Sequence, residues 1–372
     1  MVEWMKLGEI AEITIGEFVH RDKQNPEAPY PVYNGGTTYT GFYDKYNNEG
    51  NKIVISARGY AGFVNRVFNK YWAGNSSYSI KVNDSHIIWH YVYYYLKNEQ
   101  YCIMSMQQKG GGLAAISKKQ VQDILIPIPS LEEQTRIVGI LDTFTSAIDN
   151  LKEQIAQRRK QYEYYRDQLL DLEGKPGVEM KTLGDLFTFK NGLNKGKEYF
   201  GKGKPIIMFT NVFNSRFIDK SMVTSKVDIT TNELERINAR IGDVFFTRTS
   251  ETQEDVGYAS VLIEDIEECT FAGFLIRARP TTDKLLPQYC KYCFSTSIIR
   301  NAIVSQSSFT TRASLTGSGL SYIVIPVPSL EEQSRIVSIL DTFEASIQNL
   351  EAQLKEREKQ YEYYRNKLLT FE

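Results

Sequence analysis

Residues 126–170 read IPIPSLEEQTRIVGILDTFTSAIDNLKEQIAQRRKQYEYYRDQLL, and residues 325–369 read IPVPSLEEQSRIVSILDTFEASIQNLEAQLKEREKQYEYYRNKLL. The two stretches are offset by 199 residues without a gap, and 30 of their 45 positions are identical. A repeat fixes architecture before any single residue is interpreted, and this period is too long for a solenoid. The chain therefore carries two copies of one larger unit. We expect internal pseudo-two-fold symmetry and a partner that is itself approximately two-fold.

Both copies begin with the same helix-start chemistry. The proline-broken apolar stretch Ile124–Pro129, repeated at 324–328, predicts an edge strand or an extended lead-in, because proline removes a ladder donor and disfavours helix in the residue before it. Ser130 and Glu133 follow, and the pair recurs at 329 and 332. This spacing predicts a capping box, in which the hydroxyl bonds the third helical amide and the carboxylate reaches back to the serine amide. A helix start is therefore specified twice.

An apolar seam runs through both predicted helices. Apolar side chains recur at alternating spacings of four and three over about five heptads, a pattern typical of a coiled coil. A helix of roughly 40 residues spans about 60 Å. We expect the two helices to pair antiparallel with each other. Tyrosines of the seam and its flank are assigned to spacer packing and partner docking: Tyr162, Tyr165, Tyr361 and Tyr364.

Arginine interrupts the seam at equivalent places, Arg158 and Arg357. In one interpretation these side chains lie along the edge of the seam with their charged ends in water. In the other they fix the register of the helix pair. The sequence leaves both interpretations open.

Two divergent modules separate the repeats. Their openings correspond at an offset of 176 residues, with Leu7-Gly8-Glu9-Ile10 matching Leu183-Gly184-Asp185-Leu186, so the second module is 23 residues longer. Short β-rich runs, Gly and Asn turns and a helical stretch in each module predict an α+β fold. We predict four parts: a first module at 1–125, a first spacer helix at 126–174, a second module at 175–324 and a second spacer helix at 325–372.

The net charge of −1 hides a division along the chain. The modules carry +2 and +3, and the two repeated segments carry −3 each. A mildly basic module permits nucleic-acid binding, and a mixed solvated surface explains it equally well. Four Cys at irregular spacing suggest no disulfide framework, which fits a reducing cytoplasm. No apolar run approaches the roughly 20 residues of a membrane helix, so we expect a cytoplasmic protein without membrane contact.

Motifs of catalysis and of metal binding are not found in the sequence. No GxxxxGK[ST] or GxGxxG loop occurs. His86 and His90 are four apart without an HExxH motif, and Cys290 and Cys293 stand in an aromatic helical stretch where core packing is favoured over zinc. We therefore expect no catalytic residue, no metal site and no cofactor in this chain, and a binding function is favoured over an enzymatic one.

The repeated IP-x-PSLEEQ-x-RIV-x-ILD-x-F, followed by the long helix, resembles the specificity subunit of Type I restriction-modification systems over essentially the full length. The module openings and Gly242-Asp-Val-Phe-Phe-Thr-Arg-Thr-Ser250 are similar to that family as well. The resemblance implies two target recognition domains, each reading one half of a bipartite, asymmetric site in double-stranded DNA. It also implies an antiparallel helical spacer that sets the half-site distance.

The same resemblance implies that the subunit is not catalytic and docks two methyltransferase subunits. These partners bind S-adenosylmethionine and modify adenine. Restriction subunits, which use ATP and Mg, join some complexes of the family. The missing catalytic motifs agree with this role.

Candidate DNA readers lie in loops rich in Arg, Asn, Gln and Lys, which form paired hydrogen bonds to base edges. Neighbouring glycines allow the backbone to approach phosphates closely, although a plain flexible loop explains them equally well. The first module contributes Asn34, Arg58, Tyr60, Asn75, Gln107, Gln108 and Lys109. The second module contributes Asn211, Arg248, Thr249, Ser250, Gln306, Thr311 and Arg312.

A competing hypothesis is a coiled-coil scaffold that joins protein partners and reads no bases. The acidic helices with their tyrosines suit partner docking under either hypothesis. Sequence-selective, salt-sensitive DNA binding separates the two, because phosphate contacts impose a steep salt dependence.

Overall fold

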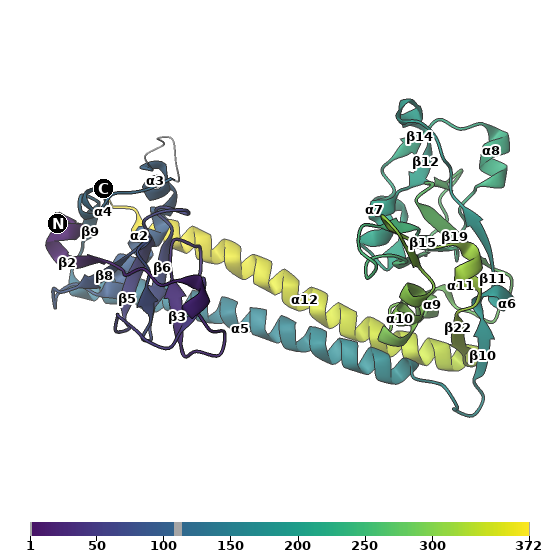
Figure 1. Ribbon diagram of the computed structural model, residues 1–372, viewed down its shortest axis with the longest axis horizontal. Coiled ribbons are helices and arrows are strands. Elements are labelled where there is room, and N and C mark those ends of the chain that lie inside the picture. The colour runs from purple at the N-terminus through teal and green to yellow at the C-terminus, as the bar shows by residue number, and fades with distance from the viewer. Residues whose placement is uncertain (1, 108–113, 372) are drawn as a thin grey trace. The chain divides into compact units, whose positions relative to one another are not determined.

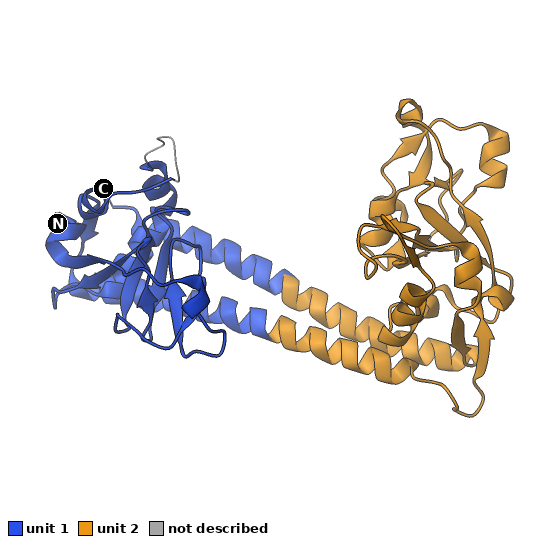
Figure 2. Cartoon of the chain, in the orientation of Figure 1, with its two compact units in different colours: residues 1–153, 352–372 blue, residues 154–351 orange. Residues whose placement is uncertain are grey.

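The computed structural model describes residues 2–107 and 114–371, and its elements are shown in Figure 1. The chain divides into two units, one of residues 1–153 and 352–372 and the other of residues 154–351 (Figure 2). We call them unit 1 and unit 2. Each unit contains one module together with a stretch of each long helix, and both ends of the chain belong to unit 1. The α+β architecture expected from the sequence is confirmed.

In the described part of unit 1, the strands form an antiparallel ribbon β1-β9, a four-stranded sheet of order β2-β8-β5-β6 and a three-stranded sheet of order β4-β3-β7. The strands are β1 (Glu3–Lys6), β2 (Ala11–Ile15), β3 (Tyr30–Tyr33), β4 (Gly41–Tyr43), β5 (Lys52–Ser56), β6 (Val64–Val67), β7 (Trp72–Ala73), β8 (Ser77–Val82) and β9 (Leu125–Ile128). The helices of this module are α1 (Leu7–Ile10), α2 (Trp89–Asn98), α3 (Gln100–Ser105), α4 (Lys118–Gln122) and the 3-10 turn η1 (Arg21–Lys23).

The strands of unit 2 form an antiparallel ribbon β10-β22, a five-stranded sheet of order β11-β19-β15-β17-β13 and two three-stranded sheets, β14-β12-β18 and β16-β21-β20. The strands are β10 (Glu179–Thr182), β11 (Phe187–Asn191), β12 (Phe200–Ile207), β13 (Phe217–Ile218), β14 (Lys226–Val227), β15 (Val244–Thr247), β16 (Thr249–Ser250), β17 (Ala259–Leu262), β18 (Thr270–Phe271), β19 (Leu275–Pro280), β20 (Ser308–Phe309), β21 (Ala313–Ser314) and β22 (Val324–Val327). The helices of this module are α6 (Leu183–Leu186), α7 (Phe209–Phe213), α8 (Thr231–Arg236), α9 (Pro287–Cys293), α10 (Ser297–Ser305), α11 (Gly317–Ser321) and the 3-10 turns η2 (Lys197–Tyr199) and η3 (Lys220–Met222).

The two long helices are α5 (Leu131–Leu170) and α12 (Leu330–Leu369), each of 40 residues. The Glu133 amide donates to Ser130 Oγ at 3.3 Å, and Ser329 caps α12 in the same way. The second half of the expected capping box is wrong, because the Glu133 carboxylate accepts two hydrogen bonds from Arg136 one turn further along. The serine alone caps each helix, and the glutamate stabilises its first turn through an ion pair.

The proline-containing lead-in to each helix is an edge strand, as expected. β9 pairs antiparallel with β1, and β22 pairs antiparallel with β10 at equivalent register. Pro127 and Pro326 therefore lie in ribbons of two strands, where the missing amide removes no bond from a larger sheet. These ribbons join the start of each module to the start of the helix that follows it.

The glycines that open the two modules confirm the correspondence of the module openings. A Cβ on Gly16 would lie 2.2 Å from the Ala73 carbonyl oxygen, and one on Gly192 would lie 2.1 Å from the Ala272 carbonyl oxygen. A side chain fits at neither place. Both modules therefore bring the same backbone segments into direct contact, although the surrounding sequences have diverged.

Each unit has its own apolar core, and the first turns of a long helix belong to it. In unit 1 the core contains Ile137 and Leu141 of α5, and in unit 2 it contains Ile336 and Leu340 of α12. Cys290 and Cys293 lie in the core of unit 2, so the core packing predicted for them is confirmed. Burial raises the pKa of both thiols, which keeps them protonated.

Candidate nucleic-acid interface

Loops from distant parts of unit 1 meet beyond the carboxyl ends of β3 and β5. The Ser76 amide donates to Asn34 Oδ1 at 2.9 Å, which ties the loop after β3 to the loop before β8. The Tyr60 amide donates to the Gly35 carbonyl at 3.0 Å, which adds the loop after β5. These loops bring together Asn34, Arg58, Tyr60 and Asn75. We call this loop cluster the rim of unit 1.

Gln107 joins the same rim from the end of α3, because its Nε2 donates to the Ala61 carbonyl at 2.6 Å. Two further candidates, Gln108 and Lys109, lie outside the described residues. Five of the seven residues singled out in this module are therefore placed by the structure, and the fold gathers all five in one region. The sequence did not reveal this proximity, since the five residues are spread over more than 70 positions.

Two glycines permit the close approach of the rim loops. Gly35 has φ +78° and Gly59 has φ +75°, the left-handed region that favours glycine. A Cβ on Gly35 would lie 2.5 Å from the Arg58 carbonyl oxygen, and one on Gly59 would lie 2.9 Å from the Gly35 carbonyl oxygen. The backbone contact therefore requires glycine on both sides.

Arg58 and Tyr60 are the exposed side chains of this rim, and the Tyr60 ring is 57% exposed. The backbone of Arg58 forms an antiparallel bridge with Ala115, which holds it against the chain that leads into α4. Its guanidinium makes no hydrogen bond or ion pair with any residue that the structure describes. The rim thus exposes a guanidinium and an aromatic hydroxyl, groups that bind base edges and phosphates. Its three amide side chains are half-buried, and Asn34 Oδ1 and Gln107 Nε2 are already hydrogen-bonded within the unit.

The corresponding region of unit 2 is built from β15, β16 and the hairpin β20-β21. The Arg248 amide donates to the Phe274 carbonyl at 2.8 Å, and the Leu315 amide donates to the Arg248 carbonyl at 2.9 Å. β16, which consists of Thr249 and Ser250, pairs with β21. Thr249 and Ser250 therefore lie in strand pairing, and Arg248, between β15 and β16, is held by two backbone hydrogen bonds. We call this region the rim of unit 2.

A cleft of about 370 Å³ opens beside the rim of unit 2. Its lining comprises Phe209 and Phe213 of α7 together with Thr249, Ser250, Glu251, Thr252, Asp255 and Arg312. Arg312 is exposed and forms a long ion pair of 3.8 Å with Glu251, itself largely exposed. An ion pair between exposed groups at this distance is weak, so the guanidinium is readily released to another anion. Thr311, beside it in the hairpin, is exposed as well.

Gln306 and Asn211 differ in whether their side-chain amides are free to bind another molecule. Gln306 caps the end of α10 and is exposed. Asn211 Oδ1 accepts from the Met208 amide, and Asn211 Nδ2 donates to the Met222 carbonyl, both at 2.8 Å. The side chain of Asn211 is thus engaged inside the module, where it fastens the start of α7. Asn211 was expected in a loop, and the structure places it in α7.

The two rims are equivalent. The backbone of Arg58 forms a bridge with Ala115, and the backbone of Thr249 pairs with Ser314. Ser314 is the counterpart of Ala115 at the repeat offset of 199 residues. Gln107 and Gln306 are related by the same offset, and each follows the last turn of a helix. Equal backbone frames therefore present different side chains, Arg58 in one unit and Thr249 in the other.

A buried glutamine at the start of each long helix was missed in the sequence. Gln134 and Gln333 are 0% exposed. Gln134 Oε1 accepts from the Ile88 amide at 2.9 Å, while its Nε2 donates to the carbonyls of His86 and Pro129 at 3.2 and 3.0 Å. Gln333 makes the equivalent three hydrogen bonds with Leu286, Lys284 and Pro328. The signal was present, because this Gln is identical in both repeats.

A second polar contact fastens each helix about two turns later. Tyr94 of α2 donates to Asp142 of α5 at 2.6 Å, and Tyr292 of α9 donates to the equivalent Asp341 of α12. Burial, and then the neighbouring carboxylate, raise the pKa of both tyrosines. Arg66 also contacts Asp142 in unit 1, at 3.2 Å. The repeated helix face is thus an attachment surface for the module.

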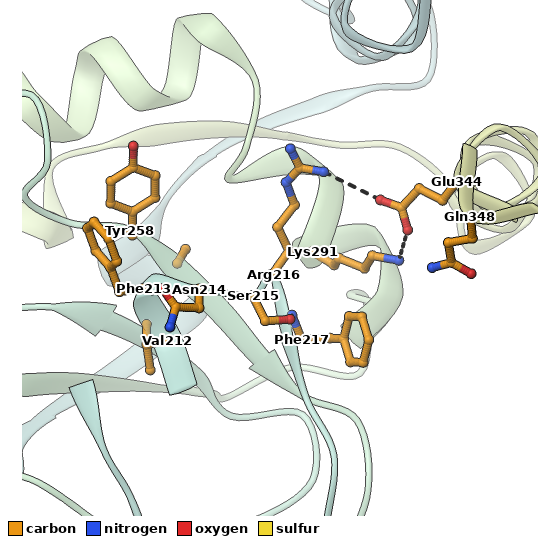
Figure 3. A pocket seen from close by; sticks show the side chains of 11 residues that line it. Val212, Phe213, Asn214, Ser215, Arg216, Phe217, Tyr258, Lys291, Glu344 and Gln348 are labelled. Carbon is orange, nitrogen blue, oxygen red and sulfur yellow. Dashed lines mark hydrogen bonds and ion pairs between the residues drawn. The ribbon is translucent and has the colours of Figure 1, made fainter. Parts of the chain in front are cut away.

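Figure 3 shows how unit 2 completes this attachment. Glu344 of α12 accepts from Lys291 Nζ at 2.6 Å and lies 3.5 Å from Arg216 Nη1, beside a cleft of about 370 Å³. Tyr162 of α5 donates to the same carboxylate at 3.1 Å. One carboxylate therefore contacts two cations of the module. These cations serve internal packing, and we do not include them among the candidate DNA contacts.

The tyrosines assigned to spacer and docking differ in exposure. Tyr162 is 4% exposed, and burial raises the pKa of its hydroxyl. Tyr361 is half-buried, whereas Tyr165 and Tyr364 are exposed. Tyr162 therefore packs inside its unit and is unavailable to a partner. The Tyr165 ring stacks on Phe343 and the Tyr364 ring stacks on Phe144, and both tyrosines remain partly exposed to solvent.

Arg158 and Arg357 lie at the border of the seam. Each donates to the glutamine three residues further along its own helix, Gln161 at 3.2 Å and Gln360 at 3.1 Å. The Arg357 guanidinium also lies 5.8 Å from the centre of the Phe144 ring. This geometry supports the interpretation of both arginines as edge residues over the interpretation in which they fix register.

Neither a membrane helix nor a metal cluster is evident within residues 2–107 and 114–371. None of the helices there is long and apolar enough to cross a membrane, and no three His, Cys, Asp or Glu side chains in those ranges are grouped as metal ligands. His90, one of the two histidines considered above, lies 3.6 Å from Asp142.

Residues 1–158 and 176–358 match the family model described as the Type I restriction modification DNA specificity domain. A specificity subunit of a type I restriction enzyme from Escherichia coli is 28% identical, covering 100% of this chain and 94% of that protein. A putative type I restriction enzyme specificity subunit from Haemophilus influenzae is 26% identical, covering 100% and 96%.

Among solved structures, the type I restriction-modification S subunit from M. genitalium superposes with a TM-score of 0.63 at 19% identity, covering 100% of this chain and 97% of that chain. A structure described as the basis of complex assembly and conformational transition of the type I restriction-modification system superposes with a TM-score of 0.61 at 18% identity, covering 99% and 96%. At this identity the structural likeness concerns the fold.

Proposed function

The chain belongs to the Type I restriction-modification DNA specificity family, and on this premise we propose that it directs a partner methyltransferase to a split DNA sequence. Each module reads one half of a bipartite, asymmetric site. The two long helices set the number of base pairs between the halves. The subunit itself carries no catalytic group, and S-adenosylmethionine, as well as ATP and Mg where a restriction subunit takes part, belong to its partners.

The pair of equivalent rims carries this proposal. The same backbone frame presents Arg58 beside Tyr60 in unit 1 and Thr249 beside Arg312 in unit 2. Arg forms two hydrogen bonds to guanine, Asn and Gln pair with adenine, and Thr contacts several bases. Equivalent frames with different side chains are what the recognition of two different half-sites requires.

The repeated helices support the docking of two methyltransferase subunits. Tyr165 and Tyr364 are related by the repeat offset, and both keep an exposed edge. A partner surface that recognises one of them fits the other as well. Two equivalent docking positions on the acidic helices therefore favour two copies of one partner.

Methylation mapping tests the proposal directly. We expect the genome of the source organism, or of a host that expresses the chain with its methyltransferase, to carry adenine methylation at one split motif that disappears when the chain is removed. A methylome without any motif that depends on this chain contradicts the proposal. In that case the coiled-coil scaffold becomes the better account, provided that the complex also fails to shift DNA at low salt.

Arg58→Ala is the sharpest single change. We expect a loss of about 1–3 kcal/mol in binding to the cognate duplex, and relaxed specificity at one base pair, because a bidentate contact would be removed. Gel shifts of the complex on the cognate duplex and its single-base variants measure both effects.

Lys45→Ala is the matched control for this experiment. Lys45 is an exposed cation in the same module, beyond the end of β4 that is opposite the rim. If both variants weaken binding equally for all sequences, Arg58 contributes only general charge and the assignment of the rim is wrong.

A further inference from the structure

Two ion pairs flank the seam between the long helices, one in each unit. Lys152 Nζ of α5 lies 3.5 Å from Glu358 Oε1 of α12 in unit 1. Arg159 Nη2 of α5 lies 2.6 Å from Glu351 Oε1 of α12 in unit 2. All four side chains are between 42% and 63% exposed. Each pair taken alone is therefore worth little stability.

The two ion pairs occupy equivalent positions of the repeat. Adding the repeat offset of 199 converts Lys152 to Glu351 and Arg159 to Glu358. The same two positions of the repeat are thus basic in the first copy and acidic in the second. The copies have diverged in sign at the places where their helices face each other.

The apolar part of the seam shows no such divergence. Phe144 stacks on Tyr364 with ring centres 5.3 Å apart in unit 1, and Tyr165 stacks on Phe343 at 5.5 Å in unit 2. These two contacts are related by the repeat offset and have the same chemistry. Apolar packing therefore suits an α5–α5 or an α12–α12 pair as well as it suits α5–α12, and it selects no partner.

The flanking charges do select one. If α5 paired with a second α5 in the same register, Lys152 would face Arg159 twice. If α12 paired with a second α12, Glu351 would face Glu358 twice. The surrounding stretches reinforce this difference, since residues 145–165 hold four basic and three acidic side chains, and residues 344–364 hold three and five.

We propose that Lys152 and Arg159 make α5 selective for a helix with acidic flanks of the α12 type, so that each half of the chain pairs with the other half and rejects a second copy of itself. The surface is the flank of the seam, and the partner that it fits is a helix with glutamate at both facing positions. Charges at such flanks determine partner choice in coiled coils more than they determine stability. The proposal is independent of DNA recognition, because its measurements involve no DNA.

Charge reversal in the full chain is the first test. Lys152→Glu with Arg159→Glu, and separately Glu351→Lys with Glu358→Arg, should each lower the denaturant midpoint of unfolding. The four changes together should restore the midpoint toward that of the parent chain. If the fourfold variant loses as much as the two double variants combined, the facing charges are not coupled and the proposal fails.

Partner choice is measured on a nicked chain. A protease site placed in the 173–177 linker is cleaved after folding, the two halves are separated in urea, and they are refolded together by dilution. Native mass spectrometry then counts mixed and like pairs. Two mixed pairs, each of one first half and one second half, contain four attractive contacts, whereas two like pairs contain four repulsive contacts. We therefore expect mixed pairs in roughly ten- to a hundredfold excess over the statistical ratio at low salt.

The controls separate charge selection from general effects. The excess should shrink at high salt, where exposed ion pairs are screened. It should vanish in the nicked double variants and return in the nicked fourfold variant. Lys160→Glu with Lys359→Glu changes exposed residues that are the same in both copies and should leave the excess unaltered. A statistical mixture from the parent chain, or halves that stay unpaired, would overturn the proposal.

Discussion

Two buried glutamines connect each module to the helix that follows it. Gln134 and Gln333 each make three hydrogen bonds to backbone groups from two other segments of the chain. Buried backbone groups that lose their partner cost far more than an average hydrogen bond contributes. A single side chain at the start of the helix therefore fixes how the module sits on the helix within its own unit.

Replacement of these glutamines tests that role. Gln134→Ala or Gln333→Ala should lower the free energy of unfolding by about 2–4 kcal/mol, because three buried polar groups lose their partner at once. Urea unfolding of the full chain measures the loss. Gln168→Ala, at an exposed position of α5, should change the free energy of unfolding by only a few tenths of a kcal/mol. Equal losses in all three variants would contradict the anchoring role.

One histidine gives unit 1 a pH dependence that unit 2 does not share. Burial, outweighing the Asp142 carboxylate and assisted by Arg66, lowers the pKa of His90 in the folded state. Its Nε2 is buried without a hydrogen-bond partner among the described residues. The corresponding residue of α9 in unit 2 is Gln288. The neutral imidazole is therefore the form that the fold accommodates.

The sign of the pH effect follows from that shift. A lowered pKa means that the unfolded chain binds the proton first, so the contribution of His90 is fully present above its unfolded pKa of about 6.5 and is lost as pH falls through the lower folded value. We expect His90→Gln to flatten the fall in stability below about pH 6.5. Urea midpoints between neutral and mildly acidic pH measure this, with Gln288→His as the reciprocal variant. Parallel curves for His90→Gln and the parent chain would contradict it.

At the scale of the elements, the 40-residue helices carry both attachment and pairing on different faces. The core face holds Ile137, Leu141 and their counterparts against the modules. The seam face carries the stacked aromatic pairs and the flanking ion pairs. Because one rigid element does both, a change in helix length moves a module without altering its rim.

Helix length is therefore expected to set the half-site spacing. Deleting residues 151–157 together with 351–357 removes one heptad from each helix at facing positions and shortens each helix by about 10.5 Å. We expect both half-sites to be retained and the spacer to shorten by at most about three base pairs. Methylation mapping measures the spacer. Deletion from α5 alone is the control and should break the register and lower stability. An unaltered spacer after the paired deletion would contradict the proposed spacer role.

At the scale of the whole molecule, the chain consists of two units with the same architecture. Each unit joins a module to both long helices, and the modules share their opening, their ribbon and their rim frame. The divergence is concentrated in the modules, which carry the positive charge, and the near-identity in the acidic helices. Under the proposed function, recognition and assembly are thereby separated along the sequence.

Exchange of one module tests this separation. If residues 1–125 are replaced by the equivalent module of a relative with a different target, only one half of the methylated motif should change, because the second rim is built from unit 2 alone. Long-read methylation mapping of the hybrid with its methyltransferase shows the outcome. Exchange of the second module, residues 175–324, should change the other half. A change in both halves after one exchange would contradict independent recognition by the modules.

Much of the scaffold was predictable because its determinants are local. The serine caps, the seam and the edge strands depend on residues within a few positions of one another, and the helices begin at Leu131 and Leu330, directly after the predicted caps. The error concerned Glu133, where the carboxylate had two acceptable donors, and the nearby arginine was preferred over the serine amide. The predicted core packing of Cys290 and Cys293 also followed from local pattern alone.

The rims depend on contacts that no local pattern encodes. Arg58 lies where it does because its backbone meets Ala115, 57 positions later, and because Gly35 and Gly59 can touch without side chains. Asn211 resembled a loop amide in sequence, but its bonds to Met208 and Met222 engage it inside the module. Tertiary structure alone decided which candidates share a surface, since those contacts join segments far apart in the chain. The amino-acid sequence alone determined the repeated helices, because capping and heptad spacing act within a few residues.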